Sequence, residues 1–260
     1  MDKFVKLGQD MVLLWSKYKV MYWAGIWNTL KLAFLATLIG CFIGLLCGVL
    51  NTIPYTKKDP LPKRFLLKLL RIIIRIYVEV FRGTPMVLQS VFIYYGLPYF
   101  SNNALRFDNI FAAALLIVAI NTGAYMAESV RGGIISIDPG QTEGAKAIGM
   151  THFQTMVNVI MPQALRNIMP QIGNNFIINI KDSSVLCVVG VSDLMFMTRS
   201  VAGIYYKGTE CYLIAAIVYL ILTYLSSLLL KALTGKMTAP DNTKRHQGNH
   251  TVDLGLPSSN

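Results

Sequence analysis

The sequence predicts an all-α membrane protein with five transmembrane helices. Hydrophobic residues make up 54% of the 260 residues and charged residues only 14%, whereas about 25% of the residues of a soluble domain are charged. Four segments carry no charge, and each approaches the roughly 20 residues that a helix needs to cross a bilayer; they are residues 32–50, 84–100, 110–127 and 212–230. A fifth apolar segment, residues 171–191, is long enough but contains Lys181 and Asp182.

The chain divides into a membrane domain and two flanking segments. We predict that the membrane domain covers residues 22–237, with a short helix at about 139–152; the spans cover about residues 22–51, 65–99, 109–131, 165–191 and 209–233. An amphipathic N-terminal segment is predicted for residues 1–21, and aromatic side chains suited to a membrane boundary gather at Trp15, Tyr18, Tyr22, Trp23 and Trp27. Residues 238–260 are polar, and a disordered tail is expected because their apolar content is too low to form a core.

The net charge of +11 is distributed as in a membrane protein rather than a nucleic-acid-binding protein. If the N-terminus lies outside, the inner regions, residues 51–75, 131–166 and 231–245, carry fourteen Lys and Arg. The outer regions carry seven, four of them within residues 1–21. Because positive charge concentrates on the cytoplasmic side, the sequence predicts an outer N-terminus and a cytoplasmic C-terminus.

Three charged residues share one face of the second predicted span. Arg75, Glu79 and Arg82 follow one another at spacings of four and three residues, which places them on the same side of a helix. Charge inside a membrane is costly and usually faces protein or water, so this face either lines a pathway or forms a neutralised stripe near the inner interface. Gly-Thr-Pro follows at residues 83–85, and its proline predicts a kink.

A short helix is predicted between the third and fourth spans. Asp138 and Pro139 are typical of an N-cap followed by the first helical residue, and the helix is expected to run to about His152. It is too polar to cross a bilayer, and Glu143 is its only acidic side chain. We therefore expect it at the membrane surface, where it is either held by another protein or is an ordinary interfacial amphipathic helix.

Polar side chains line one face of the fourth predicted span. Their spacing fits a single helical face, and the opposite face consists of Ile, Phe, Val and Leu. The polar residues are Gln171, Asn174, Asn175, Asn179, Asp182 and Ser183. Because a span that is polar on one side must cover that side with a partner or with water, this face predicts either a pathway lining or hydrogen bonds between helices.

The sequence contains no recognisable nucleotide-binding or catalytic motif. Its only Gly-Lys pair, at residues 235–236, lacks the other residues of a phosphate-binding loop, so the chain is not expected to bind ATP by such a loop. His246 and His250 lie in the polar tail without a ligand pattern, and no metal or cofactor site is expected. The four cysteines fall in or beside apolar segments and are interpreted as small buried side chains.

At residues 143–162 the sequence resembles a known family. The run EGAKAIGMTHFQTMVNVIMP is similar to the cytoplasmic EAA loop of bacterial ABC-importer permeases. The residues that match this pattern at the right spacing are Glu143, Ala145, Gly149 and Pro162; those that depart from it are Gly144, Val159 and Met161. Three further runs resemble the polar amino-acid subfamily: YVEVFRGTPMVLQSVFIYYGLP at 77–98, AYMAESVRGGI at 124–134 and PQALRNIMPQIGNNFIINIKDSSVL at 162–186. The resemblance covers about residues 22–233.

This resemblance implies a five-helix permease of the MetI-like fold that forms half of a translocation pathway. Residues 139–152 would be a cytoplasmic coupling helix. The implied ATPase-coupling residues are Glu143, Gly144, Ala145, Ala147, Ile148, Gly149, Met150 and Pro162. A separate pair of ATPase subunits would bind ATP and Mg, so this chain would be no enzyme and would bind no cofactor. The other implied partners are a second permease, identical or homologous, an extracytoplasmic solute-binding protein and the lipid of a bacterial inner membrane, without nucleic acid.

The resemblance also implies a polar amino acid as the substrate. A zwitterion carries both charges, so its site is expected to offer both signs. The candidates are Arg82 and Lys181 for the carboxylate, Glu79 and Asp182 for the ammonium, and Asn175, Asn179 and Ser183 for neutral hydrogen bonds. Lys181 and Asp182 are neighbours that point about 100° apart on a helix, so they cannot both face one spot; their alternative role is charge pairing with each other or with another helix.

Two other functions fit parts of the sequence. An ion-gradient-driven secondary transporter or channel subunit would suit the one-sided polar span and the kink at residues 83–85. Such proteins usually show inverted repeats or more spans, and neither is visible here. A membrane-embedded enzyme fits less well because no catalytic pair occurs at a usable spacing.

Overall fold

All regular structure in the described part of the chain is helical. The computed structural model describes residues 2–55, 57 and 59–237, and the tail predicted at residues 238–260 lies outside this part. The helices are α1 (Asp2–Thr52), α2 (Leu61–Gly83), α3 (Met86–Val91), α4 (Leu97–Phe100), α5 (Ile110–Ile135), α6 (Pro139–Ala147), α7 (His152–Thr155), α8 (Met161–Asp182), α9 (Leu194–Tyr205) and α10 (Gly208–Met237). Two π-helical turns, η1 (Phe92–Gly96) and η2 (Met156–Ile160), and a 3₁₀ segment, η3 (Ser183–Val189), continue these helices.

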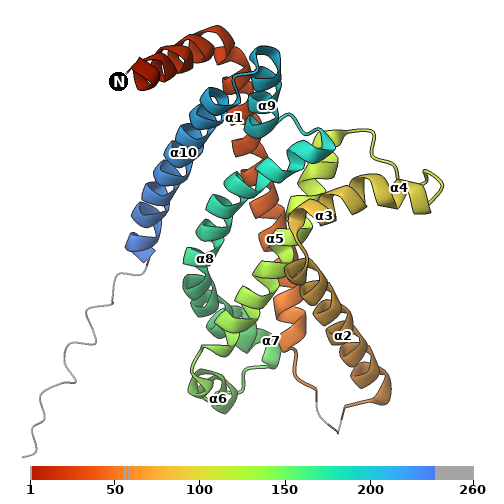
Figure 1. The fold of residues 1–260 in the computed structure, drawn as a ribbon. Coiled ribbons are helices and arrows are strands. Elements are labelled where there is room, and N and C mark those ends of the chain that lie inside the picture. Colours follow the sequence, from red (N-terminus) through yellow and green to blue (C-terminus); the bar gives the residue numbers. More distant parts are fainter. Residues whose placement is uncertain (1, 56, 58, 238–260) are drawn as a thin grey trace, which may run out of the picture.

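Three helices among the described residues are long and apolar enough to cross a membrane. They are Lys3–Thr52, Ile110–Ile135 and Gly208–Thr234, within α1, α5 and α10. The helical segment His152–Val189 together with α9 is a further candidate, bent by 52°. Figure 1 shows α6 and α7 at one end of the bundle, which we call the α6 end, and α9 at the other, the α9 end. The all-α membrane fold predicted from the sequence is therefore confirmed.

A row of glycines allows α1 and α5 to pack closely. The glycines recur at every fourth position of α1, and each faces one side chain of α5: Gly40 faces Thr122, Gly44 faces Met126 and Gly48 faces Val130. A Cβ atom added at Gly44 would lie only 2.3 Å from the Cβ atom of Met126. Small residues at such a seam let two helix backbones approach each other in a membrane, so this seam stabilises the centre of the bundle.

The first part of α1 packs against α9. α1 bends at Tyr18, where φ is −112° and ψ is 16°. Before the bend, Asp10 forms an ion pair with Lys207 at 2.7 Å. At the bend, the hydroxyl groups of Tyr18 and Tyr205 lie 3.1 Å apart. These contacts connect the N-terminal segment to the α9 end of the bundle.

The second predicted span contains a full break. The sequence predicts a span over about residues 65–99 with a kink at 83–85; in the structure α2 ends at Gly83 and α3 starts at Met86. Thr84 (φ −119°, ψ 144°) and Pro85 (φ −61°, ψ 137°) are extended. Proline lacks an N–H group and pushes the preceding residue out of the α region, so α3 cannot continue α2. Figure 1 shows α3 and α4 running to the side of α2.

A π-helical turn precedes each of two prolines. Pro98 lies just after η1 and Pro162 just after η2. In a regular helix the proline ring would clash with the carbonyl group four residues earlier. The wider turns avoid this clash, because the N–H groups before the prolines donate to carbonyl groups five residues back, Leu97 to Phe92 and Met161 to Met156. The helix from α7 to α8 therefore continues past Pro162.

The short helix predicted at about 139–152 ends earlier than expected. The structure divides this range between α6, which ends at Ala147, and α7, which begins at His152. The predicted N-cap is confirmed, since the Asp138 carboxylate accepts a hydrogen bond from the N–H of Gly140 at 2.7 Å.

Gly149 is the physical cause of the early end of α6. Its φ is +82°, a left-handed conformation that glycine adopts at little cost. The N–H of Met150 donates to the Ala145 carbonyl and the N–H of Gly149 to the Lys146 carbonyl, both at 3.0 Å, which is the Schellman pattern of helix termination. A capping box at Thr151 then starts α7. A tight, defined turn therefore joins the two helices.

Candidate functional site

The turn between α6 and α7 exposes large apolar side chains at the α6 end. Ile148 is 79% exposed and Phe153 is 75% exposed. Apolar side chains that gather on a surface often mark a contact with another protein. Ile148 is predicted from the sequence to belong to this surface, whereas Phe153 is not; the signal for Phe153 is its position in the first turn of the helix that follows Gly149.

The other predicted coupling residues divide into buried and exposed ones. Ala145 is 5% exposed and faces the protein, so it supports α6 from behind instead of joining the outer surface. Met150 is half-buried. The exposed residues are Glu143, Gly144, Ala147, Gly149 and Pro162.

The α6 region is fastened to α8. The amide group of Asn167 donates to the hydroxyl group of Ser136 at 3.2 Å, and the amide groups of Gln163 and Gln141 lie 3.5 Å apart. α6 also packs against η2, the turn that leads into α8. α6 is therefore linked to α8 directly through Gln141 and Gln163 and indirectly through η2.

Three of the predicted pathway residues, Asn175, Asn179 and Asp182, line one small polar cavity. The cavity has a volume of 130 Å³ and lies between α5 and α8. Its complete lining is Asn121, Thr122, Tyr125, Asn175, Ile178, Asn179 and Asp182. The polar face predicted for α8 contains Asn175, Asn179 and Asp182 of this lining. The lining residues of α5 are not predicted from the sequence.

Buried hydrogen bonds hold this cavity in shape. Asn179 is 3% exposed; its amide group donates to the hydroxyl group of Thr37 on α1 at 2.9 Å and accepts from that of Thr122 on α5 at 3.1 Å. The polar face of this span is predicted to form either a pathway lining or hydrogen bonds between helices, and Asn179 forms hydrogen bonds between helices. The carboxylate of Asp182, in contrast, forms no hydrogen bond or ion pair with the described residues.

Lys181 and Ser183 lie away from this cavity. Lys181 is exposed and does not share the face of Asp182, as the angle of about 100° between neighbours on a helix requires. Ser183 is fully buried, and its hydroxyl group donates to the Ile180 carbonyl at 3.0 Å. The structure thus does not bring these two predicted residues to the cavity.

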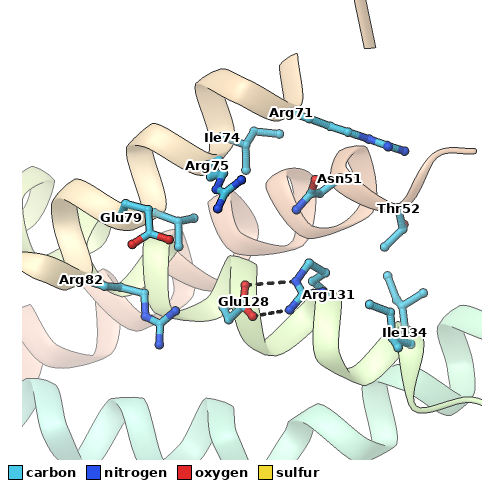
Figure 2. A pocket seen from close by; sticks show the side chains of 12 residues that line it. Asn51, Thr52, Arg71, Ile74, Arg75, Glu79, Arg82, Glu128, Arg131 and Ile134 are labelled. Carbon is cyan, nitrogen blue, oxygen red and sulfur yellow. Dashed lines mark hydrogen bonds and ion pairs between the residues drawn. The ribbon is translucent and has the colours of Figure 1, made fainter. Parts of the chain in front are cut away.

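A larger, charged cleft lies between α2, α5 and the end of α1. Its volume is 790 Å³, within the range of ligand sites in proteins. Figure 2 shows Glu79 and Arg82 on the wall formed by α2, across from an ion pair between Glu128 and Arg131 of α5. Among the described residues, neither Glu79 nor Arg82 has an ion-pair partner. The charged residues of the lining are Arg71, Arg75, Glu79, Arg82, Glu128 and Arg131.

Arg82 connects the cleft with the small cavity. Its guanidinium carbon lies 5.5 Å from the centre of the Tyr125 ring, which is a cation–π contact. Because Arg82 lines the cleft and Tyr125 lines the cavity, the two spaces are neighbours that meet at this contact. Tyr125 is missed by the sequence analysis, although its spacing of four residues from Asn121 places both on one face of α5.

The sequence and its relatives identify a protein family. The chain matches the family of binding-protein-dependent transport system inner membrane components over residues 60–239. The glutamine transport system permease protein GlnP of Escherichia coli strain K12 is 35% identical over 222 residues, covering 83% of this chain and 97% of GlnP. The arginine transport system permease protein ArtQ of Bacillus subtilis strain 168 is 32% identical over 220 residues, covering 84% of this chain and 92% of ArtQ.

Solved structures agree with this match. A chain in a crystal structure of an amino acid ABC transporter with histidines superimposes with a TM-score of 0.74 at 36% identity, covering 86% of this chain and 97% of that chain. An inward-facing structure of the MetNI methionine ABC transporter matches with a TM-score of 0.69 at 21% identity, covering 86% and 99%, and supports the fold alone. The chain therefore belongs to the family of binding-protein-dependent transport system inner membrane components, the permease subunits of ABC transporters.

Proposed function

We propose that this chain is the permease subunit of an ATP-driven importer that carries a polar amino acid. The relatives named for glutamine and arginine transport support this substrate class. The chain forms half of the translocation pathway beside a second permease and receives its substrate from an extracytoplasmic solute-binding protein. A separate pair of ATPase subunits hydrolyses ATP. Family membership favours this function over an ion-gradient-driven secondary transporter.

In this proposal the chain crosses the membrane five times with its N-terminus outside. α1, α5 and α10 form three crossings, α8 with η3 forms another, and α2 with α3 and α4 forms the broken one. The α6 end is then cytoplasmic. The Lys and Arg residues concentrated in residues 51–75, where α1 ends and α2 begins, support this orientation.

The turn after α6 is the proposed contact with the ATPase. Ile148 and Phe153 are exposed apolar side chains suited to a socket in a partner, and the exposed carboxylate of Glu143 can pair with a basic residue of that partner. Gly149 gives the turn its defined shape. When the ATPase subunits close, they move α6, and the contacts of α6 with η2 and α8 carry the motion to the polar cavity.

The cleft and the small cavity together are the proposed pathway. The cavity of 130 Å³ is smaller than the roughly 300–1,000 Å³ of common ligand pockets, but the adjoining cleft falls within that range. Arg82 can hold the substrate carboxylate by charge-assisted hydrogen bonds, Glu79 can hold the ammonium group, and Asp182 lies in the cavity beyond. Movement of the Arg82–Tyr125 contact would connect the two spaces.

The single observation that carries this proposal is the pair of charged residues, Glu79 and Arg82, that line the cleft without an ion-pair partner among the described residues. Charged groups within membrane segments usually serve the transport path. Their neighbour Tyr125 links them to the polar cavity.

The test is amino-acid uptake into proteoliposomes that contain this permease, its ATPase and its binding protein. ATP inside the vesicles should drive uptake of a polar amino acid, and Arg82→Ala should lower uptake at least about tenfold, the equivalent of roughly 1.4 kcal/mol. Arg64→Ala removes the same charge from α2 outside the cleft lining and should leave uptake near that of the unmodified protein. Undiminished uptake by Arg82→Ala would reject the pathway, and uptake driven by an ion gradient without ATP would reject the importer.

A further inference from the structure

The break between α2 and α3 leaves backbone carbonyl groups that need new partners. The last carbonyl groups of a helix find no N–H donor within the helix itself, and an unpaired carbonyl group is costly in an apolar surrounding. At this break the carbonyl groups of Phe81 and Thr84 accept hydrogen bonds from a side chain. The side chains that supply these bonds therefore decide how the two helices meet.

Gln89 of α3 reaches back over the break. Its side chain is buried, at 7% exposure of the residue. Its amide nitrogen lies 2.9 Å from the Phe81 carbonyl, 2.9 Å from the Thr84 carbonyl and 2.9 Å from the Thr84 hydroxyl. Because an amide NH₂ group has two hydrogens, it can bond to the end of α2 and to the linking residue at the same time.

Asn121 of α5 completes the arrangement. Its amide nitrogen donates to the side-chain oxygen of Gln89 at 2.9 Å and lies 3.2 Å from the Phe81 carbonyl. Asn121 is likewise 7% exposed. We call this pair the Gln89–Asn121 clamp; it fastens the end of α2 and the start of α3 to one point on α5.

The clamp lies one helical turn from Tyr125. Asn121 and Tyr125 share a face of α5 because they are four residues apart. Asn121 holds the backbone at Phe81, and the ring of Tyr125 contacts the guanidinium group of the next residue, Arg82. No carboxylate of the described residues holds Arg82 in an ion pair, so its position rests on the contact with Tyr125 and on the backbone that the clamp holds.

We propose that Gln89 and Asn121 are positioning residues that hold the end of α2 so that Arg82 reaches the junction of the cleft and the cavity. This inference rests on the proposed role of Arg82 in the pathway. Without the clamp, the end of α2 can turn and the guanidinium group leaves the junction. Asn121 also lines the cavity, but Gln89 lines neither the cavity nor the cleft, so Gln89 acts on transport through Arg82 rather than by contact with the substrate.

The experiment is a double-mutant cycle of Gln89→Leu and Arg82→Ala, measured as ATP-driven uptake by the permease–ATPase complex with its binding protein. Gln89→Leu alone should lower uptake about tenfold, the equivalent of roughly 1.4 kcal/mol, while the amount of ATPase that co-purifies stays unchanged. In the Arg82→Ala background it should cause no further loss, because coupled residues are not additive. Ser90→Ala is the matched control, since the buried Ser90 hydroxyl bonds only within its own helix, to the Val87 carbonyl at 2.7 Å.

Two outcomes would overturn the positioning role while leaving the pathway assignment intact. One is full uptake by Gln89→Leu, and the other is a double variant whose loss of uptake is the sum of the losses, in free energy, of the two single variants. Full uptake by Arg82→Ala would overturn both. If Gln89→Leu does not assemble, Gln89→Ala is used in the same cycle, because Gln89 lines neither the cleft nor the cavity; failure of both variants to assemble would show a role in folding and overturn the inference.

Discussion

Substitution of Gly44 by alanine tests the packing of α1 on α5, on which the rest of the bundle depends. The added Cβ atom would lie 2.3 Å from the Cβ atom of Met126, 2.8 Å from its carbonyl carbon and 2.9 Å from the backbone nitrogen of Ala127. Two of these three atoms belong to the backbone and cannot rotate away. The two helices must therefore separate to accommodate a single methyl group.

The size of the effect follows from these distances. Carbon atoms attract one another best at about 3.5–4.0 Å, so the contact at 2.3 Å requires the helices to move apart by roughly 1.2 Å. Overpacking of this kind costs about 1–3 kcal/mol, and the separation also weakens the contacts at Gly40 and Gly48. Alanine offsets up to about 1 kcal/mol because it favours a helix more than glycine does. We expect a net loss of about 2 kcal/mol.

The measurement is thermal unfolding of the detergent-purified permease. A loss of about 2 kcal/mol should lower the Tm by roughly 4–8 °C. The control is Gly132→Ala on α5, where an added Cβ atom meets nothing within 4 Å and the Tm should stay the same or rise. An unchanged Tm in Gly44→Ala, or an equal decrease in Gly132→Ala, would refute the argument that the glycine seam sets the distance between the helices.

Three further substitutions test the coupling turn and the polar cavity. Gly149→Ala forces a side chain into φ +82° at a cost of roughly 1–2 kcal/mol, so less ATPase should co-purify than with Gly132→Ala, and equal recovery would contradict the proposed contact. Asp182→Ala should lower ATP-driven uptake several-fold more than Lys181→Ala, because only Asp182 lines the cavity; equal losses would count against the pathway. Asn179→Leu removes the acceptor of the buried Thr122 hydroxyl group and the donor to the buried Thr37 hydroxyl group, which still donates to the Ala33 carbonyl. It should reduce stability in detergent by about 1–2 kcal/mol, and an unchanged denaturation midpoint would exclude this loss.

Local sequence patterns predict some elements of this protein well. Uncharged segments long enough to span a bilayer correspond to α1, α5 and α10, because the hydrophobic requirement acts on each helix separately. The N-cap at Asp138 is likewise a local interaction between neighbouring residues. The glycine seam at residues 40, 44 and 48 is visible in the sequence as small residues at every fourth position, although these positions alone do not name the helix that packs against them.

Other features depend on contacts between distant segments. The sequence predicts a kink at residues 83–85, but it does not predict that α3 is joined to α5 after the break by the hydrogen bond between Gln89 and Asn121, residues far apart in the chain. The early end of the helix predicted at 139–152 has a local cause instead. A glycine near a helix end, here Gly149, permits a left-handed turn without requiring one.

By itself, the sequence determined that the chain is a helical membrane protein, which family motifs it carries and which residues of α8 share a polar face. These properties follow from composition and from the 3.6-residue period of one helix. Only the tertiary structure decided that Tyr125 and Asn121 of α5 form the opposite wall, that Lys181 stays outside and that Arg82 lies between the cleft and the cavity. Helical periodicity orders the side chains around one axis, but the packing of one helix on another decides which of them meet.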